Sequence, residues 1–162
     1  MTTSIQTGRA YAQAKALAHY YLTIEPVQQV RLFGSVASTS NGNCKHDIDL
    51  ILVVNRDLFE SFVDQLNLRI DGRPLYIVAQ WLLLWCREIV EELLKAPLIS
   101  QLPETTIDYP VDILLLPIGW EDNPKKIARL TLPLRDRFLV KLGKYSRLFD
   151  SPSGDFLPPR GK

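Results

Sequence analysis

Residues 30–54 read VRLFGSVASTSNGNCKHDIDLILVV and contain the clearest strand and loop signals of the chain. The two ends of this stretch are rich in Val, Ile and Leu, which is typical of buried β-strands. The middle, residues 38–46, is rich in Ser, Asn and Gly, which is typical of a loop. The pattern therefore predicts two short strands, over residues 29–33 and 47–54, with a loop that lets the second strand return beside the first.

Asp47 and Asp49 are the unusual residues of the second apolar run. Successive side chains of a strand point to opposite faces, so the two carboxylates share one face of the predicted strand. Repulsion between them, together with partial desolvation, raises the pKa of at least one carboxylate unless a cation neutralises the pair. Carboxylate oxygens are hard ligands, which favour Mg²⁺, with Mn²⁺ as the alternative, over zinc.

The first predicted strand stops at Gly34 and Ser35, which indicates a turn. Glycine lets a ligand approach the backbone closely. The amides that follow, together with the Ser35 hydroxyl, can donate hydrogen bonds to phosphate oxygens, particularly if residues 36–38 begin a helical turn. The sequence thus predicts a phosphate-binding turn that faces a metal site.

These residues resemble the signature of the nucleotidyltransferase superfamily typified by DNA polymerase β. The shared pattern is Gly34-Ser35, a polar spacer, and Asp47-Ile48-Asp49 followed by aliphatic residues. It looks most like the minimal nucleotidyltransferases, which are small and have a single domain. The resemblance covers residues 30–54 and implies an α/β (α+β) fold of the polymerase β palm-like type, in which helices flank a small mixed β-sheet.

The resemblance also implies a set of site residues. Gly34 and Ser35 would bind the distal phosphates of a nucleoside triphosphate, and three carboxylates would bind two Mg²⁺ ions. Asp47 and Asp49 supply two of the carboxylates, and the family places the third on a later strand. The best third candidate is Asp112, a single acid inside the apolar run of residues 109–117.

Asp71 and Asp108 compete with Asp112 for the third position. Asp71 precedes Gly72, and Asp108 stands just before the apolar run of residues 109–117. Both therefore have the setting of turn residues, and Asp112 is preferred.

The activity that the resemblance implies is nucleotidyl transfer by a two-metal mechanism, with Asp47, Asp49 and Asp112 as catalytic residues. A nucleoside monophosphate, AMP from ATP, would move to a hydroxyl of a protein, an RNA or a small molecule. Minimal relatives commonly work beside a small helical protein partner in a toxin-antitoxin pair, so such a partner is expected here. The alternative is a non-catalytic nucleotide-binding or partner-binding module on the same fold.

Length and composition set the remaining expectations. A chain of 162 residues, 46% hydrophobic, predicts one domain over residues 1–150, and the Pro- and Gly-containing residues 151–162 predict a flexible tail outside the core. A net charge of +1 gives no global attraction to RNA or to a membrane, although an RNA acceptor stays open. Two cysteines outside any paired motif, and a start without the pattern of a signal peptide, favour the cytoplasm.

The other elements are predicted from apolar spacing. Residues 74–96 form either a strand followed by a helix or one long helix, too short in its apolar part to cross a bilayer. Because this segment, with Trp81 and Trp85, is apolar on several sides, it is either buried in the core or covered by a partner or a second copy of the chain. Further helices are expected over residues 5–24, 55–68, from 122 onward, and 135–149.

Overall fold

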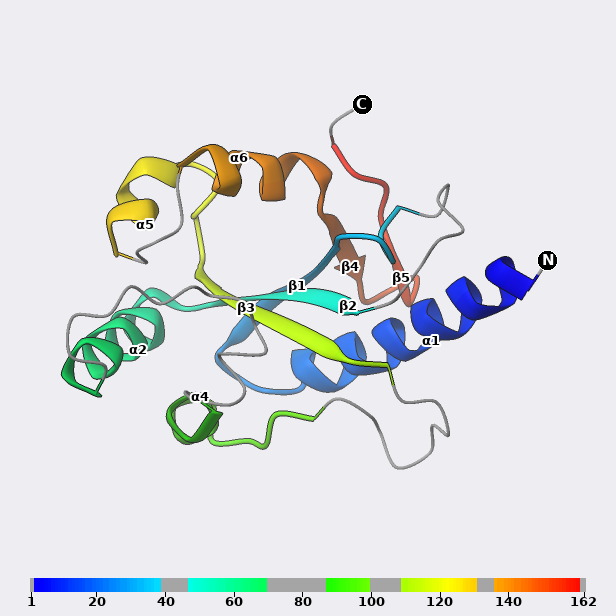
Figure 1. The fold of residues 1–162 in the computed structure, drawn as a ribbon. Helices are drawn as coiled ribbons and strands as arrows, with labels where there is room; N and C mark the ends of the chain where they lie inside the picture. Colours follow the sequence, from blue (N-terminus) through cyan, green and yellow to red (C-terminus); the bar gives the residue numbers. More distant parts are fainter. Residues whose placement is uncertain (1, 39–46, 70–86, 100–108, 131–135, 161–162) are drawn as a thin grey trace.

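The computed structural model describes residues 2–38, 47–69, 87–99, 109–130 and 136–160. Within them, five strands form one mixed sheet in the order β3-β2-β1-β4-β5. β2 and β3 run parallel, and the other neighbouring strands run antiparallel. The prediction of a small mixed sheet flanked by helices is confirmed at this level (Figure 1). The strands are β1 (Val27–Phe33), β2 (Ile48–Val54), β3 (Val111–Pro117), β4 (Arg147–Asp150) and β5 (Asp155–Phe156).

Helices cover both faces of the sheet. In Figure 1, α5 and α6 lie on one side of the strands, and α1 and α4 lie on the other. α2 packs against α4 and contributes Phe59 and Phe62 to the core on the α1 side. The helices are α1 (Thr2–Leu22), α2 (Arg56–Arg69), α4 (Arg87–Leu94), α5 (Pro124–Leu130) and α6 (Asp136–Tyr145).

The side-chain alternation of β2 divides the core into two layers. Ile48, Leu50 and Leu52 pack on the α1 side, whereas Ile51 and Val53 pack on the α6 side. A strand that is buried on both faces reads as a continuous apolar run, which explains why residues 48–54 contain a single charged residue. That residue, Asp49, has the same parity as Ile51 and therefore belongs to the α6 face.

Most of the predicted elements are confirmed. The helix expected over residues 5–24 is α1, and the strands expected over 29–33, 47–54 and 109–117 are β1, β2 and β3. Asn55 caps α2, because its side-chain Oδ1 accepts a hydrogen bond of 2.9 Å from the Leu58 backbone N–H. Of the apolar segment 74–96, the structure describes the helix α4, and Trp81 and Trp85 lie outside the described residues.

Two predictions for the C-terminal part are wrong. The last helix does not extend to Phe149 but ends at Tyr145, and the chain then forms β4. The segment 151–162, expected to add nothing to the core, contributes β5 and the buried Phe156, whose ring centroid lies 5.1 Å from that of Phe149. The Arg147 guanidinium fastens this segment by donating to the carbonyl oxygens of Phe156 at 2.9 Å and Leu157 at 3.0 Å.

On the α6 side of the sheet, a buried arginine of β1 contacts Glu121 and Ser146. Arg31 of β1 is 4% exposed, and its guanidinium lies 2.5 Å from the Glu121 carboxylate. The same guanidinium donates to the Ser146 hydroxyl at 3.3 Å, at the point where α6 gives way to β4. Glu121 thus neutralises a charge that would otherwise be costly to bury.

No helix in the described part of the chain combines the length and the apolar character that a bilayer crossing requires.

Candidate functional site

Three strand ends meet at one end of the sheet. Because β1 is antiparallel to β2, the last residue of β1 lies beside the beginning of β2, and β3 begins at the same level as β2. In this register Asp49 lies opposite Phe33 on one side and opposite Asp112 on the other. A hydrogen bond of 2.8 Å from the Ile48 backbone N–H to the Pro110 carbonyl oxygen fixes the two carboxylate-bearing strands to each other.

The start of β3 is also fixed from the α1 side. Gln13 is 2% exposed, and its Oε1 accepts a hydrogen bond of 3.1 Å from the Tyr109 backbone N–H. Its Nε2 donates to the Tyr109 carbonyl oxygen at 3.4 Å. A buried amide that bonds both groups of one backbone residue positions the chain just before Asp112.

Asp49 and Asp112 form a coupled pair of half-buried carboxyl groups. The pKa of Asp49 is raised from its ordinary value of 3.8 to about 7. Burial is the largest cause, and repulsion by Asp112, a hydrogen bond with Asp112 and repulsion by Asp47 add to it. Two carboxylates on one site cannot both ionise without cost, so the pair retains a proton up to neutral pH. Such a perturbed pair is a mark of functional sites.

Gly34 brings the turn after β1 into contact with this pair. Its φ of 77° lies in the left-handed region, and a Cβ at this position would overlap the Asp49 carboxylate oxygen. Only glycine fits both conditions. Residues 35–37 form a single turn, closed by a hydrogen bond of 3.2 Å from the Ser38 N–H to the Ser35 carbonyl oxygen.

The predicted site residues are brought together to different degrees. Asp49, Asp112 and Gly34 are in contact or in direct register. Asp47 lies just before β2, near enough to raise the pKa of Asp49, and Ser35 is in the adjoining turn. The competing acids Asp71 and Asp108 lie outside the described residues.

The acids of this site suit a magnesium ion that is bound together with a substrate. Among the residues that the structure describes, no group of three or more His, Cys, Asp or Glu side chains is arranged to hold a metal. Mg²⁺, however, is commonly held by one or two carboxylates, with water and phosphate oxygens filling its other positions. The Asp49–Asp112 pair supplies that number of carboxylates.

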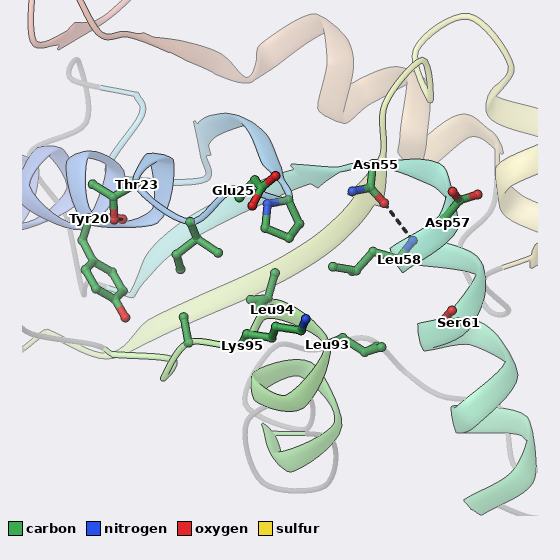
Figure 2. A pocket seen from close by; sticks show the side chains of 13 residues that line it. Tyr20, Thr23, Glu25, Asn55, Asp57, Leu58, Ser61, Leu93, Leu94 and Lys95 are labelled. Carbon is green, nitrogen blue, oxygen red and sulfur yellow. Dashed lines mark hydrogen bonds between the residues drawn. The ribbon is translucent and has the colours of Figure 1, made fainter.

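Two of the cavities in the described part of the chain lie at different ends of the sheet. One, of about 630 Å³, is bounded by the end of α1, the start of α2 and the end of α4, and includes Tyr20, Asn55 and Lys95 (Figure 2). Asn55 is six residues along from Asp49, which places this cavity about 20 Å from the carboxylate pair. A second cavity, of about 420 Å³, lies between α6 and the turn at Gly34 and therefore adjoins the pair.

The second cavity contains residues that the sequence did not indicate as functional. The apolar spacing of the helix predicted over residues 135–149 places Phe138, Leu139, Leu142 and Tyr145 on its inner face. That expectation is correct for the two buried leucines and wrong for Phe138 and Tyr145, which are 42% and 47% exposed. The aromatic residues instead line the cavity, with Lys141 between them.

Comparison of the chain with models of protein families, with characterised proteins and with solved structures gives no match. Any functional conclusion therefore depends on the residues and geometry of this site.

The raised pKa of Asp49 predicts a pH-dependent effect of Asp49→Asn on stability. The unfolded chain releases this proton near pH 3.8, whereas the folded protein holds it until about pH 7, so the wild type loses stability as pH rises between these values. In the presence of a chelator, we expect the variant to be more stable than the wild type at pH 8 by roughly 1–2 kcal/mol and to lose this advantage towards pH 4. Urea unfolding at several pH values measures the difference.

Asp64→Asn is the matched control, because Asp64 is an exposed carboxylate on α2. Its effect on the free energy of unfolding should stay within about 0.5 kcal/mol at every pH. If the effect of Asp49→Asn does not vary with pH, or if the substitution destabilises the protein at pH 8, then the pKa of Asp49 is not raised in the folded protein.

A second prediction concerns the turn. Gly34→Ala introduces a Cβ into the left-handed region and against the Asp49 carboxylate, so it should destabilise the protein by roughly 1–3 kcal/mol. Gly8→Ala is the control, since a Cβ at Gly8 of α1 meets no atom within 4 Å. It should stabilise the helix by roughly 0.5–1 kcal/mol. Equal effects of the two substitutions, measured by thermal unfolding, would rule out the close contact.

Proposed function

We propose that this protein is a Mg²⁺-dependent nucleotidyltransferase that moves a nucleoside monophosphate, AMP from ATP, to an acceptor hydroxyl. The observation that carries the proposal is the pairing of Asp49 with Asp112 on adjacent parallel strands, next to the glycine turn that ends β1. Carboxylates on neighbouring strands supply oxygen ligands, and the exposed backbone at Gly34 gives phosphate oxygens room to approach.

Each group has a role that follows from its position. Asp49 and Asp112 would hold the Mg²⁺, and Asp47, the other expected carboxylate ligand, is close enough to raise the pKa of Asp49. The turn at Gly34 and Ser35 binds the distal phosphates. When bound, the cation neutralises the carboxylate pair and withdraws electron density from the α-phosphate.

The transfer itself is an in-line displacement. The acceptor oxygen forms a bond to the α-phosphorus, the bond from that phosphorus to the pyrophosphate oxygen breaks, and pyrophosphate leaves with the electron pair. Asp112 takes the proton of the acceptor hydroxyl. The acceptor belongs to a protein, an RNA or a small molecule, and a small helical partner protein is one source of such a hydroxyl.

A second candidate is a non-catalytic module that binds a nucleotide through the same residues. It is favoured by one observation: within the described ranges, the acids do not form a group of three that could hold a metal. Two carboxylates can position one cation, whereas a two-metal displacement uses more ligands. Magnesium-dependent nucleotide binding without release of pyrophosphate would support this candidate.

Calorimetry with each of the four nucleoside triphosphates, with and without Mg²⁺, tests the proposed site. We expect at least one triphosphate to bind, and its affinity to fall at least tenfold in the Asp49→Asn, Asp112→Asn double variant, because each substitution removes a charged oxygen ligand. The exposed-acid variant Asp64→Asn should bind as the wild type does. Unchanged Mg²⁺-dependent binding in the double variant would reject the proposed metal ligands.

A further inference from the structure

The cavity between α6 and the turn after β1, here called the α6 cavity, is distinct from the carboxylate pair and adjoins it. Its volume is about 420 Å³, which is within the range of small-molecule pockets, roughly 300–1,000 Å³. Gly34 is common to both features, since it lines the cavity and lies against the Asp49 carboxylate. Its lining includes Gly34 of the turn and Phe138, Lys141 and Tyr145 of α6.

The helix α6 presents two aromatic rings and a cation to this cavity. Phe138, Lys141 and Tyr145 are spaced three and four residues apart, so they lie along one face of the helix. Phe138 is 42% exposed and Tyr145 is 47% exposed, although each ring would gain by leaving water. Aromatic residues exposed inside a concave surface are typical of a binding site.

Positive charge on the α6 side of the cavity favours an anionic ligand. Lys141 lines it, and the Lys144 ammonium lies 5.6 Å from the centroid of the Tyr145 ring. The exposed backbone of Gly34 is at the opposite wall, where phosphate oxygens would be close to the carboxylate pair. The cavity thus combines flat apolar surfaces with positive charge, which is the combination that a nucleotide requires.

We propose that the α6 cavity binds the nucleoside part of a nucleotide, with the base against Phe138 and Tyr145 and the phosphates directed towards Lys141 and Gly34. This assignment rests on the proposed function for the position of the phosphates, and it adds the residues that hold the base. Stacking on aromatic rings tolerates any base, so the cavity selects for nucleotides as a class.

The experiment compares ligands that contain the base with a ligand that lacks it. The affinities of ATP, of inorganic tripolyphosphate and of adenosine are measured by calorimetry for the full chain, with and without Mg²⁺. Phe138→Ala and Tyr145→Ala should each weaken ATP binding about tenfold and leave tripolyphosphate binding unchanged, because the rings contact only the base. Lys141→Gln should weaken ATP and tripolyphosphate alike.

Matched controls are available on the same helix. Val140 is 55% exposed and Arg137 is exposed, and neither lines the cavity. Val140→Ala and Arg137→Gln should therefore leave all three affinities unchanged. The thermal midpoint of every variant is measured as well, so that a loss of binding is not confused with a loss of folding.

The outcomes separate this inference from the proposed function. If Phe138→Ala and Tyr145→Ala weaken ATP while the Asp49→Asn, Asp112→Asn variant does not, the cavity assignment stands and the metal-dependent transfer fails. If the acid variant loses ATP binding and the aromatic variants retain it, the proposed metal ligands stand and the cavity assignment fails. The cavity assignment is overturned if the wild type binds neither ATP nor adenosine, or if the aromatic variants weaken ATP and tripolyphosphate equally.

Discussion

The pairing of β2 with β1 on one side and with β3 on the other sets the position of every residue in the candidate site. Asp49 lies opposite Phe33 and opposite Asp112 because of this register alone. If β2 slipped by one residue, Asp49 would point to the α1 side, where Ile48 and Leu50 now pack. Those two apolar side chains would then point to the α6 side of the sheet. The hydrophobic alternation of β2 therefore fixes the carboxylate pair together with the core.

The pair is costly for the folded protein in the absence of a cation. Burial and mutual repulsion hold a proton on Asp49 up to about pH 7. Elsewhere on the same face, the buried Arg31 is matched by Glu121 at 2.5 Å, so the fold does neutralise a buried charge where it is structural. The buried arginine is thus paired with an acid, whereas Asp49 is close to two other acids, Asp112 and Asp47, which raise its pKa.

The central part of the fold could be predicted because its signals are local and strong. The apolar runs of β2 and β3 each contain one acid, and the loop between β1 and β2 is marked by Gly, Ser and Asn. Asp49 and Asp112 could be proposed as neighbours from the resemblance, although no spacing in the sequence specifies the parallel register of their strands. The structure supplies that register.

The C-terminal part could not be predicted, for a physical reason visible in its residues. Leu142, Tyr145 and Phe149 continue a helical spacing, so the sequence favours a helix through residue 149. The chain instead turns at the buried Ser146, whose N–H donates to the Leu142 carbonyl oxygen at 2.8 Å and whose hydroxyl accepts from Arg31, 115 residues earlier. A contact so distant in sequence leaves no periodic signal. Phe138 and Tyr145 are exposed and line the α6 cavity instead of packing in the core.

Carbon-13 NMR titration of the Asp49 side-chain carboxyl, first with a chelator and then with Mg²⁺, would test whether the carboxylate pair binds a cation. A strained pair that binds a cation should titrate near pH 7 without metal and well below that with Mg²⁺, because the ion displaces the proton. A midpoint near the ordinary value of 3.8 under both conditions would mean that the two carboxylates do not share a site. A midpoint near 7 that Mg²⁺ does not move would mean that the pair is strained but is not a magnesium site.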